Sequence, residues 1–377
     1  MSRGEHWTPG SWRERLAPQQ PAYADPAAAE RALAQIAAGG PLVTVEECVA
    51  LRQAVARAAR GEAFLLQAGD CAESLANDPG EAAAALASLL SDLARACGRP
   101  AIQIGRIAGQ FAKPRSAELE RRGDRSLPVY RGDAVNGLAF AAAARAHDPA
   151  RLVEAVRHAR TTTRWLRATG APLFTSHEAL LLGLEEALCF QSPDGRWWAG
   201  SGHLPWVGER TRDPAGAHVH FASGIANCVA VKCGPGLDPA GMIALAERLD
   251  PEREPGRLIF VARLGADAIA DRLPALLAAA REAALAAAWV VDPMHGNSRR
   301  VDGRKQRRLA DILTETRAFF AICREAGTVP AGLHLEVTTG DRAECVGADG
   351  IDPGADFPCD PRLTRAEALA VVEASQC

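Results

Sequence analysis

The stretch 63-AFLLQAGDCAES-74 combines an apolar run with a polar cluster that follows it directly. Residues 63–69 are almost entirely apolar, as is typical of a strand that is buried on both faces of a sheet. Asp70, Cys71 and Glu73 follow at the point where this strand is expected to end. The same order of an apolar run and then polar or charged residues recurs along the chain, and this recurrence decides the fold.

Eight short apolar runs follow one another, with amphipathic helical patterns between them. In residues 82–97 and 267–281, for example, the aliphatic side chains fall on one helical face. Apolar strands that alternate with helices indicate a parallel sheet covered on both sides, and eight such units favour a closed (β/α)8 barrel in the α/β class. Pro205 makes the fourth strand the weakest of these predictions. The predicted strands are residues 63–69, 101–107, 171–176, 203–208, 228–234, 256–264, 287–293 and 332–338.

The first 60 residues precede the barrel and are predicted to form a short N-terminal extension that packs on it. Residues 26–37 and 44–60 look helical, and the second segment begins with a capping-box pattern. We therefore assign residues 1–60 to an arm with helices and residues 61–377 to a single catalytic barrel. The other predicted helices lie near residues 149–168, 178–190, 214–226, 239–249 and 305–326.

The composition excludes several classes of function. A formal net charge of -3 creates no global field that would attract nucleic acid or an anionic membrane. The N-terminus has no apolar signal region and no long apolar stretch follows, so we expect a cytoplasmic protein that is not exported. The ten cysteines are scattered without a CxxC pair, which favours reduced core thiols over a disulfide framework.

Cationic residues follow or end several of the predicted strands. Lys232 and Arg263 lie inside otherwise apolar runs, where an unpaired cation is costly to bury. Either residue alone could form a structural ion pair or extend its charged end to water. Arg106 and Arg210 come from two further strand ends. Because the carboxyl ends of barrel strands meet at one mouth, the four cations together predict an anionic ligand that carries phosphate and carboxylate.

Three side chains of metal-ligand type also stand at neighbouring strand ends. Cys71 follows the first strand, His295 the seventh and Glu336 the eighth. A thiolate, an imidazole and a carboxylate favour Mn, Co, Fe or Zn over Mg or Ca. Each residue also has a purely structural interpretation, as a small core thiol, a hydrogen-bonded loop residue or a paired acid. The pair His218 and His220 resembles the HxH of metal-dependent amidohydrolase barrels, but it lies mid-chain in a predicted helix.

Ten stretches, in order, resemble the class II (plant-like) 3-deoxy-D-arabino-heptulosonate 7-phosphate (DAHP) synthases. They are LLQAGDCAES, GRIAGQFAKPRS, YRGDAVNG, TSHEALLLGLEEAL, WVGERTR, GIANCVAVKCGPGLDP, VARLGAD, DPMHGN, GLHLEVTTGDRAECVG and CDPRLT. That family condenses phosphoenolpyruvate with erythrose 4-phosphate and water in the first step of the shikimate pathway, and its fold is a (β/α)8 barrel. The resemblance runs from about Trp12 to about Leu369.

The resemblance implies a complete set of site residues. Spacing alone does not separate Asp360 from Asp352 and Asp356 as the fourth metal ligand. The implied ion is Mn2+ or Co2+, with Zn2+ or Fe2+ as alternatives. The implied metal ligands are Cys71, His295, Glu336 and Asp360. The implied phosphoenolpyruvate site is Arg106, Glu209, Arg210, Lys232 and Arg263, and the implied erythrose 4-phosphate site is Lys113, Pro114, Arg115 and Ser116.

One departure from the family pattern concerns regulation. Long members carry an inserted helical pair associated with feedback by aromatic amino acids, whereas residues 138–170 here have room for about one helix. We therefore predict an enzyme that is insensitive to Phe, Tyr and Trp and serves secondary metabolism. Separately, we expect a homo-oligomer, most simply a dimer. A variant that uses an amino or imino sugar phosphate, and a non-catalytic relative, remain alternatives. Glu209, Lys232 and His295 are equal candidates for proton transfer.

Cys359 precedes the implied ligand Asp360. If Asp360 and Cys71 bind the same ion, Cys359 must lie close to Cys71. We therefore predict that loss of the metal together with an oxidant joins the two thiols reversibly. No base is implied beside Cys71, so a nucleophilic role for this thiol is not expected.

Overall fold

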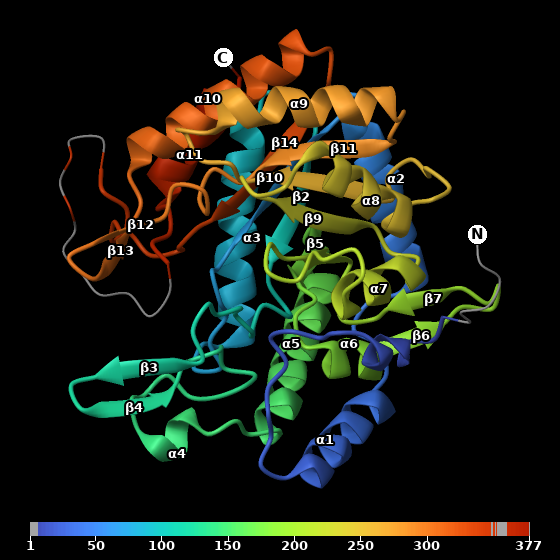
Figure 1. The fold of residues 1–377 in the computed structure, drawn as a ribbon, viewed down its shortest axis with the longest axis vertical. Helices are drawn as coiled ribbons and strands as arrows, with labels where there is room; N and C mark the ends of the chain where they lie inside the picture. The colour runs from blue at the N-terminus through green and yellow to red at the C-terminus, as the bar shows by residue number, and fades with distance from the viewer. Residues whose placement is uncertain (1–6, 348–349, 351, 353–359, 377) are drawn as a thin grey trace.

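The structure is a computed structural model and describes residues 7–347, 350, 352 and 360–376. Eight parallel strands close into a barrel that helices surround on the outside (Figure 1). All eight predicted strands and the predicted (β/α)8 architecture are confirmed. The barrel strands are β1 (Phe64–Gly69), β2 (Ala101–Arg106), β5 (Leu173–Glu178), β8 (Leu204–Val207), β9 (Val229–Cys233), β10 (Leu258–Ala262), β11 (Ala287–Val291) and β14 (Pro330–Glu336).

The barrel closes where its first strand pairs with its last. β1 pairs in parallel with both β14 and β2, and the order around the barrel follows the order along the chain. The strand that contains Pro205 also forms. Pro205 is paired on the β5 side, opposite His177, and the ladder to β9 begins one residue later at Trp206, where an N–H is present.

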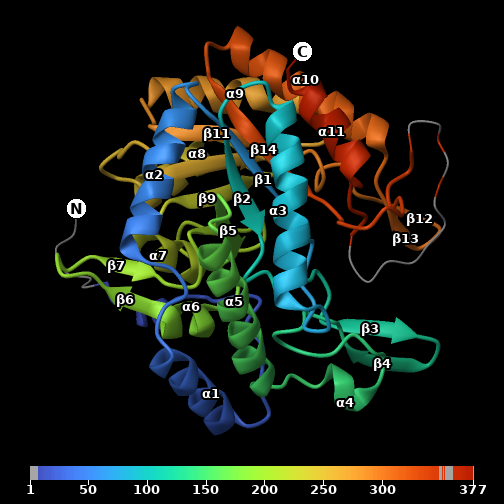
Figure 2. The ribbon, with the colours of Figure 1, turned by 180° about the vertical axis from the view of Figure 1, so that it is seen from behind.

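The predicted helices are present between the strands and pack on the outside of the barrel. Figure 2 shows α3 and α5 running along the face of the barrel near β1, β2 and β5. The helices after β1 are α3 (Pro79–Ala96), α4 (Ala142–Arg145), α5 (Ala150–Thr169), α6 (Leu182–Leu188), α7 (Ala217–Gly224), α8 (Pro239–Leu249), α9 (Ile269–Glu282), α10 (Leu309–Glu325) and α11 (Arg365–Ala374). Apart from the single turn α4, residues 138–170 contain one helix, as predicted.

The N-terminal extension contributes the floor of the barrel. Helix α2 (Val45–Ala59) contacts β1, β11 and β14. Its buried residues Leu51 and Val55 belong to the same apolar cluster as residues from the early parts of the barrel strands, such as Leu65 and Ile259. This helix therefore seals the amino end of the barrel, and ligands have access from the carboxyl end. The boundary at residue 60 stays a prediction.

The rest of the extension packs on the side of the barrel. Helix α1 (Pro26–Ala38) contacts α5 and α6, and the short helix η1 (Ser11–Glu14) contacts α7. His218 and His220 lie in α7 and are explained by these contacts. His218 Nε2 lies 3.3 Å from Gln20 Nε2, and His220 Nε2 lies 2.9 Å from Ser11 Oγ. The two histidines therefore support the N-terminal arm, and the amidohydrolase interpretation of this pair is not favoured.

Three short antiparallel hairpins were not predicted. Figures 1 and 2 both show the first and third projecting from one side of the molecule, where the carboxyl ends of the barrel strands lie. The sequence does contain a signal for the third, because Asp302-Gly303 has the positive φ angles of a two-residue hairpin turn. The hairpins are β3 (Leu119–Arg122) with β4 (Arg125–Pro128), β6 (Cys189–Gln191) with β7 (Trp197–Ala199), and β12 (Arg299–Val301) with β13 (Arg304–Gln306).

Two further features of the described residues are the state of the cysteines and the apolar character of the helices. The eight cysteines among them are free thiols, and seven of these are buried, as expected for core cysteines in a reduced chain. Within the same residues, none of the helices combines the length and the apolar character that a membrane span needs.

Candidate active site

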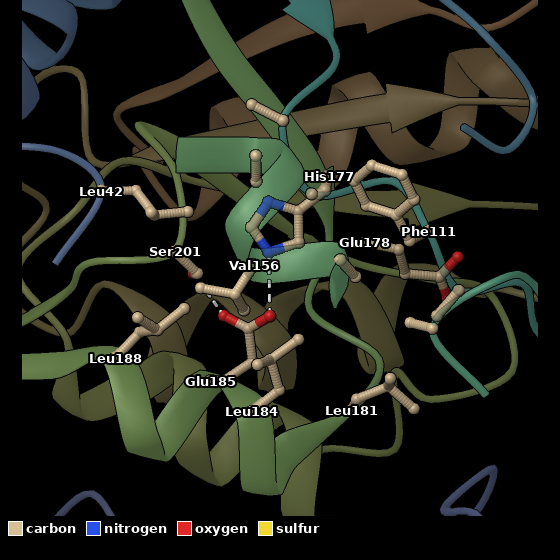
Figure 3. A pocket seen from close by; sticks show the side chains of 16 residues that line it. Leu42, Phe111, Val156, His177, Glu178, Leu181, Leu184, Glu185, Leu188 and Ser201 are labelled. Carbon is tan, nitrogen blue, oxygen red and sulfur yellow. Dashed lines mark hydrogen bonds and ion pairs between the residues drawn. The ribbon is translucent and has the colours of Figure 1, made fainter. Parts of the chain in front are cut away.

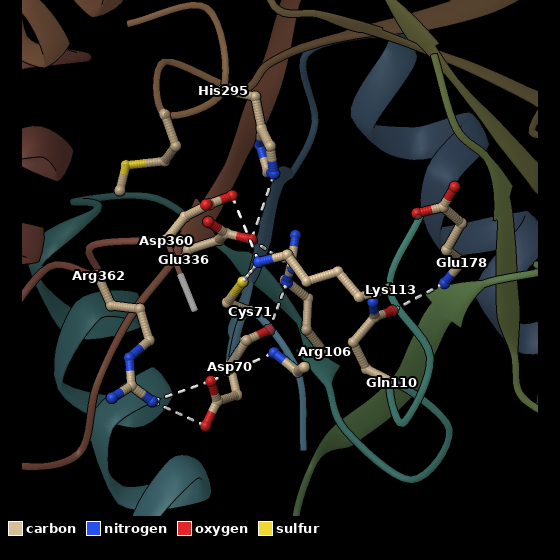
Figure 4. A network of polar contacts seen from close by, with 12 residues as sticks. Asp70, Cys71, Arg106, Gln110, Lys113, Glu178, His295, Glu336, Asp360 and Arg362 are labelled. Atoms are coloured by element: carbon tan, nitrogen blue, oxygen red, sulfur yellow. Dashed lines mark hydrogen bonds and ion pairs between the residues drawn. The ribbon is translucent and has the colours of Figure 1, made fainter. Parts of the chain in front are cut away.

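Three of the predicted metal ligands converge at the carboxyl end of the barrel. Cys71 follows β1, Glu336 is the last residue of β14, and Asp360 comes from the segment that leads to α11. The Cys71 Sγ and one carboxylate oxygen from each acid lie within 4.8 Å of one another, and all three residues are buried (Figure 4). Strands β1 and β14 pair directly, so barrel closure brings together residues that are far apart in the chain.

His295 lies beside this cluster. Its Nε2 is 3.3 Å from Glu336 Oε1, and its Nδ1 is 2.7 Å from Asp292 Oδ2. Burial opposes ionisation of Asp292, but His295 and Lys232 hold the pKa of this carboxyl well below its usual value. An ionised Asp292 accepts a hydrogen bond from His295 Nδ1–H, and Nε2 then lies on the side of Glu336. This is the arrangement in which an imidazole can donate its free nitrogen to a metal ion.

The charge around Glu336 supports a ligand role for this acid. Arg106 Nη2 donates to Glu336 Oε1 at 2.8 Å, and Arg307 Nη1 donates to Oε2 at 2.6 Å. Burial opposes ionisation, but His295 and these two arginines hold the pKa of Glu336 well below its usual value. Glu336 is therefore a carboxylate. A thiolate, an imidazole and two carboxylates form a donor set that fits a borderline divalent ion.

Asp360 is tied to the cluster by cations. Lys113 Nζ lies 3.4 Å from Asp360 Oδ2 and 2.5 Å from Cys71 Sγ, and Lys305 forms a close ion pair with Oδ1. Asp352, which spacing made an equal candidate, instead accepts a hydrogen bond from Gln306 at 2.5 Å. The structure therefore distinguishes the two acids by location. Asp356 and Cys359 lie outside the described residues, so the predicted redox pair with Cys71 is not described.

The residues predicted to hold the sugar phosphate follow β2 in one segment. Arg115 Nε donates to the Tyr130 carbonyl at 2.6 Å, and Pro114 joins Arg115 to Lys113. Ser116 Oγ accepts hydrogen bonds from Arg210 Nε at 3.2 Å and from Arg210 Nη2 at 2.7 Å. The structure thus places this segment next to Arg210, a residue of the predicted phosphoenolpyruvate site.

Two of the predicted cations lie inside the barrel, and both are paired. Lys232 Nζ donates to Asp292 Oδ2 at 2.6 Å, and burial lowers the pKa of this lysine to about 8 although Asp292 opposes the shift. Arg106 pairs with Glu336 as described above. The two cations are also neighbours, since both lie over the Trp206 ring, at 5.2 Å for Arg106 and 5.9 Å for Lys232. Each cation is therefore one member of an ion pair, and together the two cations concentrate positive charge inside the barrel.

Glu209 connects the carboxyl ends of three strands. Its Oε2 accepts a hydrogen bond from Gly234 N at 2.8 Å and lies 3.8 Å from Arg263 Nη1, while Oε1 accepts from Arg212 at 2.7 Å. Arg263 also donates to the His295 carbonyl at 3.1 Å. Glu209 and Arg263 are therefore fixed at the barrel mouth.

The acids that flank Cys71 have structural partners. Asp70 accepts two hydrogen bonds of 2.9 Å from Arg362 Nη1, which ties β1 to the segment that carries Asp360. Glu73 accepts hydrogen bonds from three successive backbone N–H groups, of residues 108–110, at 2.7 to 3.0 Å. These contacts fix the segments on either side of the thiol.

Sequence reasoning missed Arg307, Lys305 and Asp292 as members of this site. Lys305 and Arg307 fell in a segment predicted as helix, although Arg307 lies just before α10 and is fully buried against Glu336. No local pattern identifies Arg307, because its partners are distant in the chain. Asp292 follows β11 directly, and its place at a strand end was an available signal.

The sequence matches the family described as the class-II DAHP synthetase family over residues 7–172 and 169–374. A phospho-2-dehydro-3-deoxyheptonate aldolase of Streptomyces coelicolor is 38% identical, over 95% of this chain and 94% of that protein. A probable phospho-2-dehydro-3-deoxyheptonate aldolase of Pseudomonas fluorescens is 43% identical, over 94% of each chain.

The fold has a counterpart among solved structures. The structure of a phospho-2-dehydro-3-deoxyheptonate aldolase from Francisella tularensis SCHU S4 matches with a TM-score of 0.56 over 91% of this chain and 96% of that chain. The sequence identity is 16%, so this similarity concerns the fold alone.

Proposed function

The chain belongs to the class-II DAHP synthetase family, and from this membership we propose that it condenses phosphoenolpyruvate with erythrose 4-phosphate and water to give DAHP and phosphate in a metal-dependent reaction. The observation that supports the proposal is the juxtaposition of two kinds of group at one barrel mouth. Cys71, Glu336 and Asp360 supply possible metal donors within 4.8 Å of one another. Arg106 donates a hydrogen bond to Glu336, and both Arg106 and Lys232 lie over the Trp206 ring.

Phosphoenolpyruvate carries a carboxylate and a phosphate, and the barrel offers cations for both. Arg106 and Lys232 provide buried positive charge, and Arg210 and Arg263 lie at the rim. Because Lys232 and Arg106 stand in a region of low dielectric, they attract an anion more strongly than exposed cations would. Glu209 holds Arg263 in place, so the substrate meets a preformed set of charges.

The second substrate is expected beside the first. Lys113, Arg115 and Ser116 follow β2, and Ser116 contacts Arg210, so the sugar phosphate would lie at the outer side of the enolpyruvyl group. A phosphate bound there directs the aldehyde toward the barrel interior. The enol carbon of phosphoenolpyruvate then attacks this aldehyde carbon and forms the new carbon–carbon bond.

Cys71, His295, Glu336 and Asp360 would hold the divalent ion, which when bound supplies a Lewis acid that polarises the aldehyde carbonyl. Asp292 and Arg307 keep two of these donors oriented, since they contact His295 and Glu336. We expect Mn2+ or Co2+ to serve, and Zn2+ or Fe2+ as alternatives, because the donor set mixes sulfur, nitrogen and oxygen.

The function is tested by mixing the Mn2+-loaded protein with phosphoenolpyruvate and erythrose 4-phosphate and following the loss of enolpyruvate absorbance together with DAHP formation. We expect turnover in the wild type and its loss in Asp360→Asn. Asp352→Asn is the matched control, because Asp352 pairs with Gln306 and is expected to leave turnover intact. Absence of product with each of Mn2+, Co2+, Zn2+ and Fe2+ would rule out the proposal.

Regulation and assembly belong to the same proposal. Between β2 and β5 the chain has one hairpin, one helical turn and α5, which leaves no helical pair for an aromatic effector site of the kind found in long members. We propose a cytoplasmic homodimer that is insensitive to Phe, Tyr and Trp and supplies secondary metabolism. Strong inhibition by millimolar aromatic amino acids would contradict the insensitivity, and sedimentation at the monomer mass would contradict the dimer.

A further inference from the structure

Two helices outside the barrel each carry a fully buried acid, Glu185 in α6 and Glu315 in α10. Figure 3 shows that Glu185 reaches two side chains, with His177 Nε2 at 2.8 Å and Ser201 Oγ at 2.5 Å. Glu315 instead reaches the segments that follow two barrel strands at the candidate active site. Because burial of an acid is costly unless its partners compensate, the partners of Glu315 indicate its role.

The first partners of Glu315 lie directly after β10. Its Oε1 accepts hydrogen bonds from Leu264 N at 2.8 Å and from Gly265 N at 2.7 Å. These two residues follow Arg263, a cation of the predicted phosphoenolpyruvate site. Glu315 therefore fixes the backbone from which the Arg263 side chain extends.

The third hydrogen bond of Glu315 comes from the segment after β11. Oε2 accepts from Asn297 Nδ2 at 2.7 Å, and Asn297 stands two residues after the predicted metal ligand His295. The Asn297 amide cannot turn over freely, because Nδ2 also donates to the Pro293 carbonyl at 2.8 Å and Oδ1 accepts from Ala266 N at 2.9 Å. The amide thus presents an N–H to Glu315, and only an acceptor can receive it.

The two segments also contact each other directly. Arg263 Nη2 donates to the His295 carbonyl oxygen at 3.1 Å. A Cβ built on Gly296 would lie 2.3 Å from Gly265 N, so glycine is needed for this close approach of the two backbones. A displacement of His295 would therefore disturb a contact of Arg263, and a displacement of Arg263 would disturb a contact of His295.

The place of Glu315 is costly for an acid. Burial raises the pKa of Glu315 to about 8, the charge of Asp292 adds to the shift, and the hydrogen bonds from Leu264, Gly265 and Asn297 oppose it. A well-packed apolar residue would fill a buried position at lower cost. What the acid provides here is the orientation of the two segments that donate to it.

We propose that Glu315 couples the binding of phosphoenolpyruvate to the binding of the metal ion, an inference that rests on the proposed function. Glu315 is a positioning residue, since it acts through the backbone next to Arg263 and through Asn297. It holds the segments after β10 and β11 as one unit, in which Arg263 and His295 keep a fixed relation. A ligand that orders one of these residues then orders the other, and each ligand tightens the binding of the other by the same factor.

The test measures the Kd of Mn2+ by titration calorimetry, with and without saturating phosphoenolpyruvate. In the wild type, phosphoenolpyruvate should lower this Kd about 5- to 150-fold. Glu315→Gln should remove most of this effect and weaken Mn2+ binding by itself about tenfold. In either orientation of the new amide, its N–H group would face another N–H group, of Asn297 or of Leu264 and Gly265.

Kinetics distinguish this role from a general loss of structure. At saturating Mn2+, Glu315→Gln should raise KM for phosphoenolpyruvate about tenfold. KM for erythrose 4-phosphate should change little, because its predicted site at residues 113–116 follows β2, which stands opposite β10 in the barrel. Asn297→Ala breaks the same contact from the other segment and should give the same pattern, so the test does not depend on the folding of one variant.

Glu185→Gln is the matched control, because it changes the other buried acid, whose partners lie outside both segments. It should keep the wild-type coupling factor, and melting temperatures show that the variants are folded. The inference would be overturned by a wild type without coupling, by an unchanged factor in Glu315→Gln, or by an equal loss in Glu185→Gln. A wild type that binds both ligands with coupling but forms no DAHP would instead overturn the proposed function.

Discussion

Cys71 lies in a turn whose polar side chains reach three different parts of the chain. Asp70 pairs with Arg362, Glu73 holds the backbone after β2, and the Cys71 thiol lies within 4.8 Å of Glu336 and Asp360 oxygens. Gly69 allows this turn, because a Cβ there would lie 2.6 Å from the Arg106 carbonyl oxygen. The acids beside the thiol therefore serve as anchors that fix its position relative to the other donors.

Arg307 is expected to control metal affinity without being a ligand. It is fully buried and contacts both Glu336 and Asp360, at 2.6 Å and 3.6 Å. Arg307→Met should weaken Mn2+ binding about 10- to 100-fold, because a carboxylate that has lost its outer partner is no longer held in the ligating orientation. Titration calorimetry measures the effect.

Two variants make this experiment specific. Arg308→Met changes the exposed neighbour and should leave Mn2+ affinity unchanged, while Arg307→Lys should restore part of it. Tighter binding in Arg307→Met would mean that repulsion between the guanidinium and the ion outweighs orientation, and would contradict the prediction.

The pH dependence of phosphoenolpyruvate use should report on Lys232. Burial lowers the pKa of this lysine to about 8, so the ammonium is present below that pH and is lost as the pH rises through it. The kcat/KM for phosphoenolpyruvate should therefore fall about tenfold per pH unit well above pH 8. Lys232→Arg should move this fall to higher pH, since arginine stays protonated. A flat profile between pH 7 and pH 10 would contradict the assignment.

At the scale of elements, the carboxyl ends of the strands act as a connected rim. Glu209 contacts Gly234 N, and Arg263 N donates to the Cys233 carbonyl at 2.9 Å, so the ends of β8, β9 and β10 are fixed to one another. Figure 4 shows the side chains from the ends of β1, β2 and β14 pointing toward one another across this mouth. The hairpin β12–β13 adds Lys305 from outside the barrel.

The helix that forms the floor is expected to stabilise the whole barrel. Leu51 of α2 is completely buried against inward-facing strand residues. Leu51→Ala should lower the free energy of unfolding by about 2 to 5 kcal/mol, because it leaves a cavity in a closed barrel. Urea unfolding followed by circular dichroism measures the change. Gln53→Ala, on the exposed face of the same helix, should change it by less than about 0.5 kcal/mol.

At the scale of the molecule, the candidate metal centre joins the first and last strands and the C-terminal segment. An ion that binds only the folded chain stabilises it, by about 2.7 kcal/mol at a concentration 100 times its Kd. Scanning calorimetry should therefore show a higher unfolding temperature with Mn2+ than with a chelator. In Cys71→Ser this increase should be much smaller. An equal increase in both proteins would indicate that Mn2+ stabilises the chain at a different place.

The sequence by itself determined the barrel, because buried parallel strands and amphipathic helices are local patterns that each segment carries alone. Residues 203–208 were correctly assigned in spite of Pro205, since the neighbouring ladder starts after it. The sequence did not predict the three hairpins or α11. The strands of β3–β4 and β12–β13 are short and polar and lack an apolar period, and those of β6–β7 have only three residues each. Helix α11 was missed although Thr364 and Glu367 form a capping box.

Only the tertiary structure decided how the site is assembled. Asp360 lies beside Cys71, whereas Asp352 accepts a hydrogen bond from Gln306. The spacing of the two acids in the sequence did not distinguish between them. The tertiary structure also set Arg307 against Glu336 and joined Glu315 to the segments after β10 and β11. These relations depend on barrel closure, which places residues from opposite ends of the chain within a few ångströms, and no local pattern records which of them will meet.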